Sequence, residues 1–98
     1  MTITKTVNKE ETTLALAGCL DTSAAPDFDA ALKACAGAPT LVIDFSELEF
    51  IASSGLRQLV TANKQAVAEG RTIVLTGMNE VVAEVFDVTG LLEVFTVR

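Results

Sequence analysis

The sequence predicts an α/β fold in which helices pack on a mixed, mostly parallel sheet that carries an antiparallel strand at its edge. Three observations support this. Strand-like and helix-like segments alternate along the second half of the chain, as in βαβ crossovers. Two strand-like segments precede them with only a short polar stretch between. Half of the 98 residues are hydrophobic, which is enough for one core. We therefore expect a single domain, an α/β sandwich, over residues 1–98.

The first half of the chain is expected to form a hairpin and then a helix. Residues 2–9 and 12–18 have the composition of strands, and the polar NKEE stretch between them favours a turn. Thr22 or Ser23 can cap the helix, and Pro26 suits its first turn. Four side chains then fall on one helical face, at i, i+3, i+4 and i+7: Phe28, Ala31, Leu32 and Cys35.

The middle of the chain predicts a buried strand and a long helix. Residues 40–45 form a short β-rich run typical of a central strand, and the SELEF segment after it is expected to be a polar connection. A helix follows from Ser54 and ends at Gly70. Its expected inward positions are Leu56, Leu59, Val60, Asn63 and Val67.

The last third predicts one more strand, a third helix and a final strand-like segment. Residues 71–77 form a second core strand, and Asn79 is placed to cap the helix after it. Gly90 ends that helix, and residues 91–97 are again strand-like. The apolar set of the third helix is Val81, Val82, Val85 and Phe86.

Charge and composition exclude several function classes. The net charge of −6 repels phosphate backbones and anionic lipid surfaces, so we expect neither a nucleic acid nor a membrane as partner. No apolar segment is long enough for a secretory leader or a membrane span, which predicts a cytoplasmic protein. The chain has no histidine, so Ser-His-Asp catalysis and a phosphohistidine relay are excluded.

The two cysteines predict no metal site and no disulfide. Cys19 and Cys35 lack CxxC spacing, and without histidine a zinc site would need two thiols and carboxylates. Both cysteines have apolar neighbours in the sequence, so we expect both to be buried free thiols.

Two adjacent serines mark the boundary between a strand and a helix. In an α/β sheet this is where ligands usually bind, because the first N–H groups of the helix lack partners and the helix dipole is positive there. Ser53 is expected to be the N-cap, with Ser54 and Gly55 in the first turn. An anion, or a phosphate attached to a serine, would be stabilised at this position.

Four interpretations of the serine pair can be compared. A nucleophile elbow needs G-x-S-x-G and a histidine, and a phosphate-binding loop needs G-x-x-x-x-G-K-[ST]; the IASSG segment fits neither. The remaining two interpretations are a helix cap and a regulatory phosphoacceptor. The residues alone leave both open.

Three segments together resemble the STAS family, which is named for sulfate transporters and anti-sigma-factor antagonists. LALAGCLDTSAAPDF resembles the early strand, the G-x-L-D turn and the first helix of the family. TLVIDFSELEFIASSGLRQL resembles the hallmark segment, an apolar strand ending in Asp and then, after an aromatic residue, D-S-S/T/A-G-L. RTIVLTGMNEVVAEVFDVTGLLEVF resembles the next strand, the capped third helix and the T-G-L ending. The resemblance covers nearly the whole chain in order.

This resemblance implies an anti-sigma-factor antagonist with no catalysis and no cofactor of its own. In such antagonists a partner kinase, which is also the anti-sigma factor and a GHKL-type ATPase, phosphorylates one serine; a serine phosphatase reverses the modification. The unphosphorylated antagonist binds the kinase, and phosphorylation breaks the complex. The acceptor maps onto Ser53. The expected partner contacts are Asp21, Thr22, Ser54, Gly55, Arg57, Met78 and Asn79.

One position supports an alternative. Ala52 stands where phosphorylated members of the family usually carry Asp. The resemblance therefore also implies a constitutive STAS adaptor, a subunit of a transport ATPase or of a signalling complex, in which the serines are only contact residues. Many members also continue into a final helix beyond the position of Arg98, and this part of the usual packing or partner surface would be absent. An enzyme or a small-ligand binder is the weakest hypothesis, because the site residues that either would need are missing.

Overall fold

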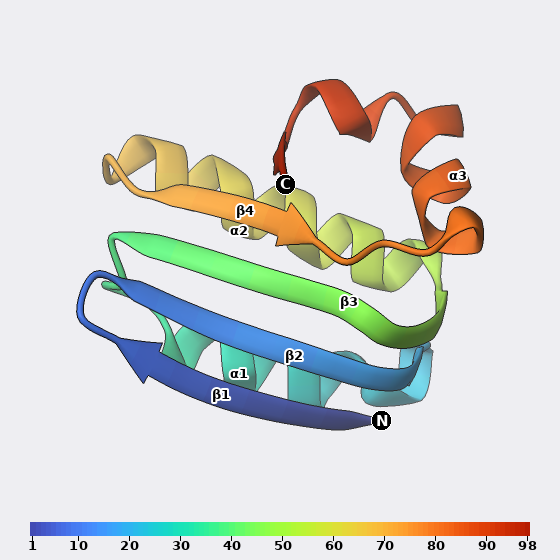
Figure 1. Ribbon diagram of the computed structural model, residues 1–98, viewed down its shortest axis with the longest axis horizontal. Coiled ribbons are helices and arrows are strands. Elements are labelled where there is room, and N and C mark those ends of the chain that lie inside the picture. The colour runs from blue at the N-terminus through green and yellow to red at the C-terminus, as the bar shows by residue number, and fades with distance from the viewer.

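The computed structural model describes residues 1–98 and confirms the predicted α/β class (Figure 1). The strands form one five-stranded sheet in the order β1-β2-β3-β4-β5. β1 pairs with β2 antiparallel at the edge, and the other neighbours are parallel. The elements are β1 (Thr2–Asn8), β2 (Glu11–Leu20), η1 (Thr22–Ala24), α1 (Ala25–Ala34), β3 (Thr40–Ile51), α2 (Ser53–Ala68), β4 (Thr72–Thr76), α3 (Glu80–Val88), η2 (Leu91–Glu93) and β5 (Thr96–Val97).

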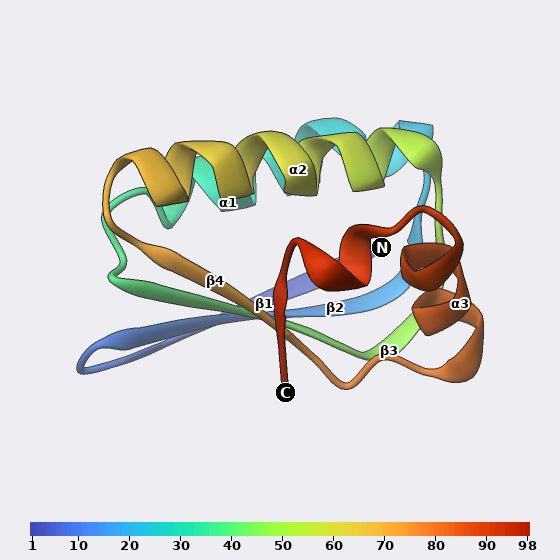
Figure 2. The ribbon, with the colours of Figure 1, turned by 90° about the horizontal axis from the view of Figure 1, so that it is seen from above.

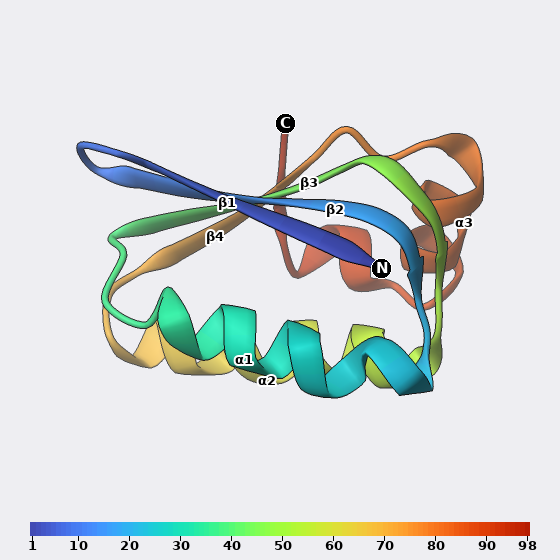
Figure 3. The same cartoon turned by 90° about the horizontal axis from the view of Figure 1, so that it is seen from below.

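The helices lie on one side of the sheet. α1 and α2 run side by side along one face, and α3 stands at the end of the sheet where α2 begins (Figures 2 and 3). No helix covers the opposite face. The carboxyl ends of β2, β3 and β4 and the beginnings of η1, α2 and α3 therefore gather at one end of the molecule (Figure 1).

The core lies between the sheet and the helices. Alternate residues of β2 and β3 point toward the helices, among them Leu14, Leu16 and Ile43, which are all fully buried. Phe28 of α1 and Leu59 of α2 are 0% exposed and fill this layer from the other side. Three aromatic rings close the core beside α3, with centroid distances of 5.8 Å and 6.1 Å between successive rings: Phe45, Phe86 and Phe95.

The predicted polar connection SELEF is wrong, because β3 continues through it to Ile51. Leu48 in its centre points into the core and is 1% exposed. The register against β2 shifts twice here, each time with one additional residue on β3. Such bulges bend a strand. β3 accordingly curves toward the helical layer and leads into α2 (Figure 3).

Two predicted helix caps are also wrong. The side chain that caps η1 belongs to Asp21, because its Oδ1 accepts the Ala24 N–H at 3.0 Å, and Thr22 and Ser23 lie inside the turn. Ala52, not Ser53, occupies the N-cap position of α2, and it has no side chain that could accept a hydrogen bond.

Three other predictions about burial or extent need correction. Cys19 is exposed at the end of β2, whereas Cys35 is buried and free as expected. Val67 and Val81 are 67% and 60% exposed, so they lie outside the apolar faces of α2 and α3. The final strand-like segment is mostly a 3₁₀ turn, and only Thr96–Val97 pair with β4.

Candidate functional site at the carboxyl end of the sheet

The parallel pairing of β2 and β3 brings Asp21 beside the serine pair. Leu20 lies opposite Ile51 in the register, and the Ala52 N–H donates to the Leu20 carbonyl at 2.8 Å. The next residue of each strand therefore starts a turn into a helix at the same place. Asp21 and Ser53, which are far apart in the sequence, are held at one edge by this backbone bond.

Ser53 is the first residue of α2 and is exposed. Its hydroxyl makes no hydrogen bond in the structure, and the N–H groups of Ser53 and Ser54 donate to no protein acceptor. Both groups are therefore free at the positive end of a 16-residue helix. Because the Ser53 hydroxyl does not cap the helix, it remains available for a reaction or for a partner.

Asp21 is held in its ionised form by local hydrogen bonds. Its Oδ1 accepts the Ser23 hydroxyl at 2.7 Å and the Ala24 N–H at 3.0 Å. The hydroxyl of Ser23, and then the N–H of Ala24, lower the pKa of Asp21 below its ordinary value. A fixed negative charge thus lies at the edge that carries Ser53, and the exposed side chain of Thr22 is next to it.

Gly55 allows α2 to begin directly against β2. A Cβ atom at this position would lie 2.8 Å from Cγ and Cδ2 of Leu20 and 3.2 Å from Cγ1 of Ile51. Gly55 is buried, so the structure places it in the packing beneath the predicted partner contacts rather than on the surface. The position of Ser53 depends on this close approach.

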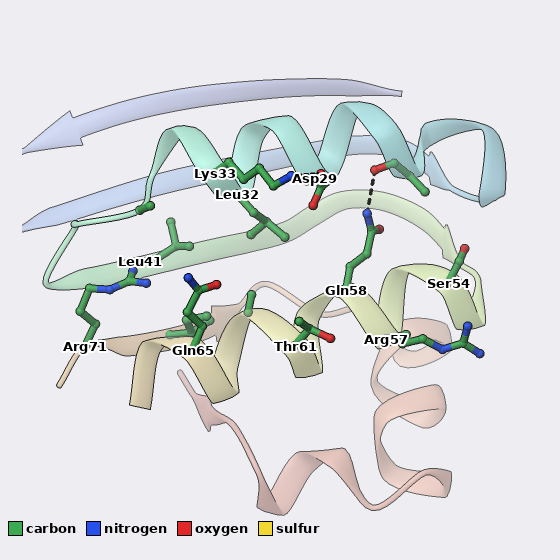
Figure 4. A pocket seen from close by; sticks show the side chains of 14 residues that line it. Asp29, Leu32, Lys33, Leu41, Ser54, Arg57, Gln58, Thr61, Gln65 and Arg71 are labelled. Atoms are coloured by element: carbon green, nitrogen blue, oxygen red, sulfur yellow. Dashed lines mark hydrogen bonds and ion pairs between the residues drawn. The ribbon is translucent and has the colours of Figure 1, made fainter. Parts of the chain in front are cut away.

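Ser54 and Arg57 both line the groove beside α1, but they differ in exposure. Ser54 is half-buried, and its Oγ has no hydrogen-bond partner. Arg57 is exposed and belongs to none of the three ion pairs of the protein. Its side chain extends outward near the beginning of the helix (Figure 4). Arg57 is therefore an unpaired cation one helical turn from Ser53, available for an anionic group.

Met78 and Asn79 lie at the neighbouring strand end rather than against Ser53. Asn79 caps α3, as predicted, because its Oδ1 accepts the Val82 N–H at 2.9 Å. Its Nδ2 also donates to the Leu48 carbonyl at 2.9 Å, which ties α3 to β3. Met78 is half-buried and packs against the core. These residues form the side of the site next to β4.

A groove of about 520 Å³ between α1 and α2 was not predicted (Figure 4). Leu32, Leu41 and Ile73 lie in it, and Ser54 and Gln58 line the end close to the site. The Nε2 of Gln58 donates to the Ala25 carbonyl at 2.7 Å, but its Oε1 has no protein partner. Polar residues four apart on α2 are the only sequence signal for this feature.

The structure contains neither a cluster of metal-ligating side chains nor a membrane-spanning helix. No group of three or more potential metal-ligating side chains occurs in the structure. None of the helices is both long enough and apolar enough to cross a lipid bilayer. What the site does offer is a free hydroxyl, free backbone donors, a fixed carboxylate and an unpaired guanidinium.

Comparison with family models decides the classification. Residues 3–96 match the model described as "Mlab, STAS domain". The chain belongs to the STAS family. No match was found among curated protein sequences. The STAS resemblance of the three sequence segments is thereby confirmed.

Several solved structures share the fold over almost the full chain. An anti-sigma factor antagonist from Mycobacterium paratuberculosis is 24% identical, with a TM-score of 0.88 over 98% of this chain and 83% of that one. RsbS from Moorella thermoacetica, in a serine-to-glutamate variant, is 27% identical, with a TM-score of 0.79 over 98% and 85%. The phosphorylated form of the Bacillus cell fate determinant SpoIIAA is 23% identical, with a TM-score of 0.77 over 99% and 91%.

Proposed function

We propose that this STAS protein is an anti-sigma-factor antagonist of the cytoplasm, which binds an anti-sigma factor with serine-kinase activity and is released by phosphorylation of Ser53. The observation that carries the proposal is the unbonded, exposed Ser53 hydroxyl at the first position of α2, with Asp21 fixed beside it. The likeness to antagonists of 23–24% identity supports the fold on which the proposal rests. In this proposal the protein has no catalysis of its own and acts by binding.

In the free protein, a phosphate on Ser53 would be stabilised electrostatically by its surroundings. It would add about −1.5 to −2 charges next to the free N–H groups of Ser53 and Ser54, within one turn of Arg57. In the complex the same phosphate would have to lose its water and to face the nucleotide phosphates that a kinase holds opposite its acceptor. One modification therefore favours the free state over the bound state.

Intact-mass analysis with purified GHKL-type anti-sigma kinases and ATP tests the acceptor. We expect the wild-type protein to gain the mass of one phosphate and Ser53→Ala to gain none. Ser54→Ala is the matched control, because it removes the adjacent half-buried hydroxyl and should still be phosphorylated. Phosphate on Ser53→Ala, or none on the wild type with any such kinase, would exclude Ser53 as the acceptor.

A second candidate is a constitutive STAS adaptor of a transport ATPase or signalling complex. The specific observation in its favour is Ala52, which leaves the N-cap of α2 without a carboxylate. An adaptor would keep its partner when Ser53 is replaced by Glu, whereas a phosphorylation-controlled antagonist would lose it. Binding of the same partner by Ser53→Ala and Ser53→Glu with equal affinity would favour the adaptor.

A further inference from the structure

The negative charge of the protein is concentrated at the end that carries Ser53. Segments 21–27, 44–57 and 76–87 meet there, at the carboxyl ends of β2, β3 and β4 (Figure 1). They hold eight of the thirteen carboxylates and one of the seven basic residues, Arg57. The rest of the chain is close to neutral. The acidic composition is therefore a local property of this end rather than an even surface charge.

The same end exposes the one accessible aromatic side chain of the protein. Four of the five phenylalanines are buried, with exposed fractions of 6% or less, whereas Phe50 is 49% exposed. Phe50 lies opposite Cys19 in the β2–β3 register, and Cys19 is exposed as well. Since Leu20 points into the core, its neighbour Cys19 points to the face that no helix covers, and Phe50 does the same.

Carboxylates flank this aromatic residue. Glu47 and Glu49 are exposed on the same stretch of β3, and neither forms an ion pair. Ser53 follows Phe50 by three residues. An exposed aromatic group within a carboxylate rim is the arrangement of an interface anchor, because aromatic side chains dominate binding energy and surrounding charges set the choice of partner.

We propose that the protein partner extends from Ser53 onto the uncovered face of the sheet and receives Phe50 in an apolar pocket rimmed by Arg or Lys side chains. This inference rests on the proposed function for the identity of the partner, an anti-sigma kinase. Charge complementarity argues for its chemistry: an end with eight carboxylates and one base attracts a basic surface. The basic groups face Glu47 and Glu49, away from the nucleotide phosphates opposite Ser53. The contact at Phe50 thus holds the complex, and the contact at Ser53 controls it.

The test measures dissociation constants for the GHKL-type kinase that binds the wild-type protein best. Phe50→Ala is expected to weaken binding by about 10- to 100-fold, as loss of an interface anchor does. Val67→Ala is the matched control, because Val67 is 67% exposed at the other end of α2 and should leave the affinity unchanged. The combined variant Glu47→Gln and Glu49→Gln should bind several-fold more weakly and with a smaller dependence on salt, whereas Glu10→Gln in the hairpin turn should do neither.

Each outcome separates this inference from the proposed function. Unchanged affinity of Phe50→Ala, with Ser53 still phosphorylated, overturns the docking surface and leaves the acceptor in place. If a kinase binds Phe50→Ala more weakly than the wild type but never phosphorylates Ser53, the docking surface is supported and the proposed regulation by phosphorylation is overturned. If no such kinase binds the wild type, both are overturned. Equal melting temperatures of the variants establish that the affinity changes come from the surface.

Discussion

Ser53 and Gly55 lie two residues apart at the beginning of α2 and have opposite environments. Ser53 is exposed and makes no side-chain hydrogen bond, whereas Gly55 is buried against Leu20 and Ile51. The free hydroxyl depends on the packed glycine, because the first turn of the helix takes its position from this contact. At the scale of single residues, the Ser53 hydroxyl is positioned by a glycine that must lack a Cβ atom.

Gly55→Ala tests this dependence. The added methyl group would meet Leu20 at 2.8 Å, a distance that requires a shift. We expect a loss of about 1–3 kcal/mol in the free energy of unfolding, measured with urea, which is the usual cost of overpacking.

The control combines Gly55→Ala with Leu20→Val, which makes room for the added methyl group. In a Leu20→Val background the same substitution should cost less, since part of the clashing side chain is gone. An equal loss in both backgrounds would show that the clash with Leu20 is not the cause.

The ionisation of Asp21 predicts a pH dependence with a definite sign. Hydrogen bonds from Ser23 and Ala24 lower its pKa in the folded state, so ionised Asp21 stabilises the fold above its unfolded pKa of about 3.9. This contribution is lost as the pH falls through the lower, folded-state pKa. We expect an NMR titration to give a pKa below 3.9 for Asp21 and Ser23→Ala to raise it. A wild-type pKa at or above the ordinary value would contradict the cap described for η1.

At the scale of elements, β3 positions the site, and it is the element that the sequence predicts least well. Its first half has the apolar run of a buried strand. In its second half the two register shifts break the two-residue alternation, so exposed polar residues follow one another as they do in a loop. Only Leu48 and Ile51 are buried there, three residues apart. Bulges depend on pairing with β2, and pairing is not visible in a local pattern.

Helix caps and helix faces were predicted to within a residue or two. Asp21, Thr22 and Ser23 can all cap a turn, and only the backbone angles select Asp21. In α2 the buried position near the end is Ala66 rather than Val67, because Ala66 follows the buried Leu59 by seven residues and so lies on the same helical face. Local patterns therefore gave the elements, while tertiary packing decided their ends.

The cap of α3 also joins two elements, and Asn79 variants can separate the two roles. Asn79→Ala removes both the cap and the bond to the Leu48 carbonyl, and we expect it to cost about 1–2 kcal/mol in unfolding free energy. Asn79→Asp keeps the acceptor for the Val82 N–H and loses only the donor to Leu48, so its loss should be smaller. Equal losses for the two variants would mean that the cap does not contribute to stability.

At the scale of the whole molecule, the sequence predicted the fold class, which the mixed five-stranded sheet confirms, and the family, which the match over residues 3–96 confirms. The closeness of Asp21 and Ser53 follows from parallel pairing of β2 and β3, which the order of the elements implies. The exposure of Phe50 and the groove between α1 and α2 were not predictable. Both depend on which face of the sheet the helices cover, and an apolar strand pattern leaves that choice open.

The central claim is that a phosphate on Ser53 separates the protein from its kinase partner. The most direct measurement is the dissociation constant of that complex for the unphosphorylated protein and for the same protein carrying phosphoserine at position 53. We expect the phosphorylated form to bind about 100-fold more weakly or worse, which corresponds to about 3 kcal/mol. Phosphothreonine at position 61, an exposed residue farther along α2, serves as the control for added charge. Equal dissociation constants for the phosphorylated and unphosphorylated forms at position 53 would contradict the claim and leave Ser53 as a contact residue of a constitutive adaptor.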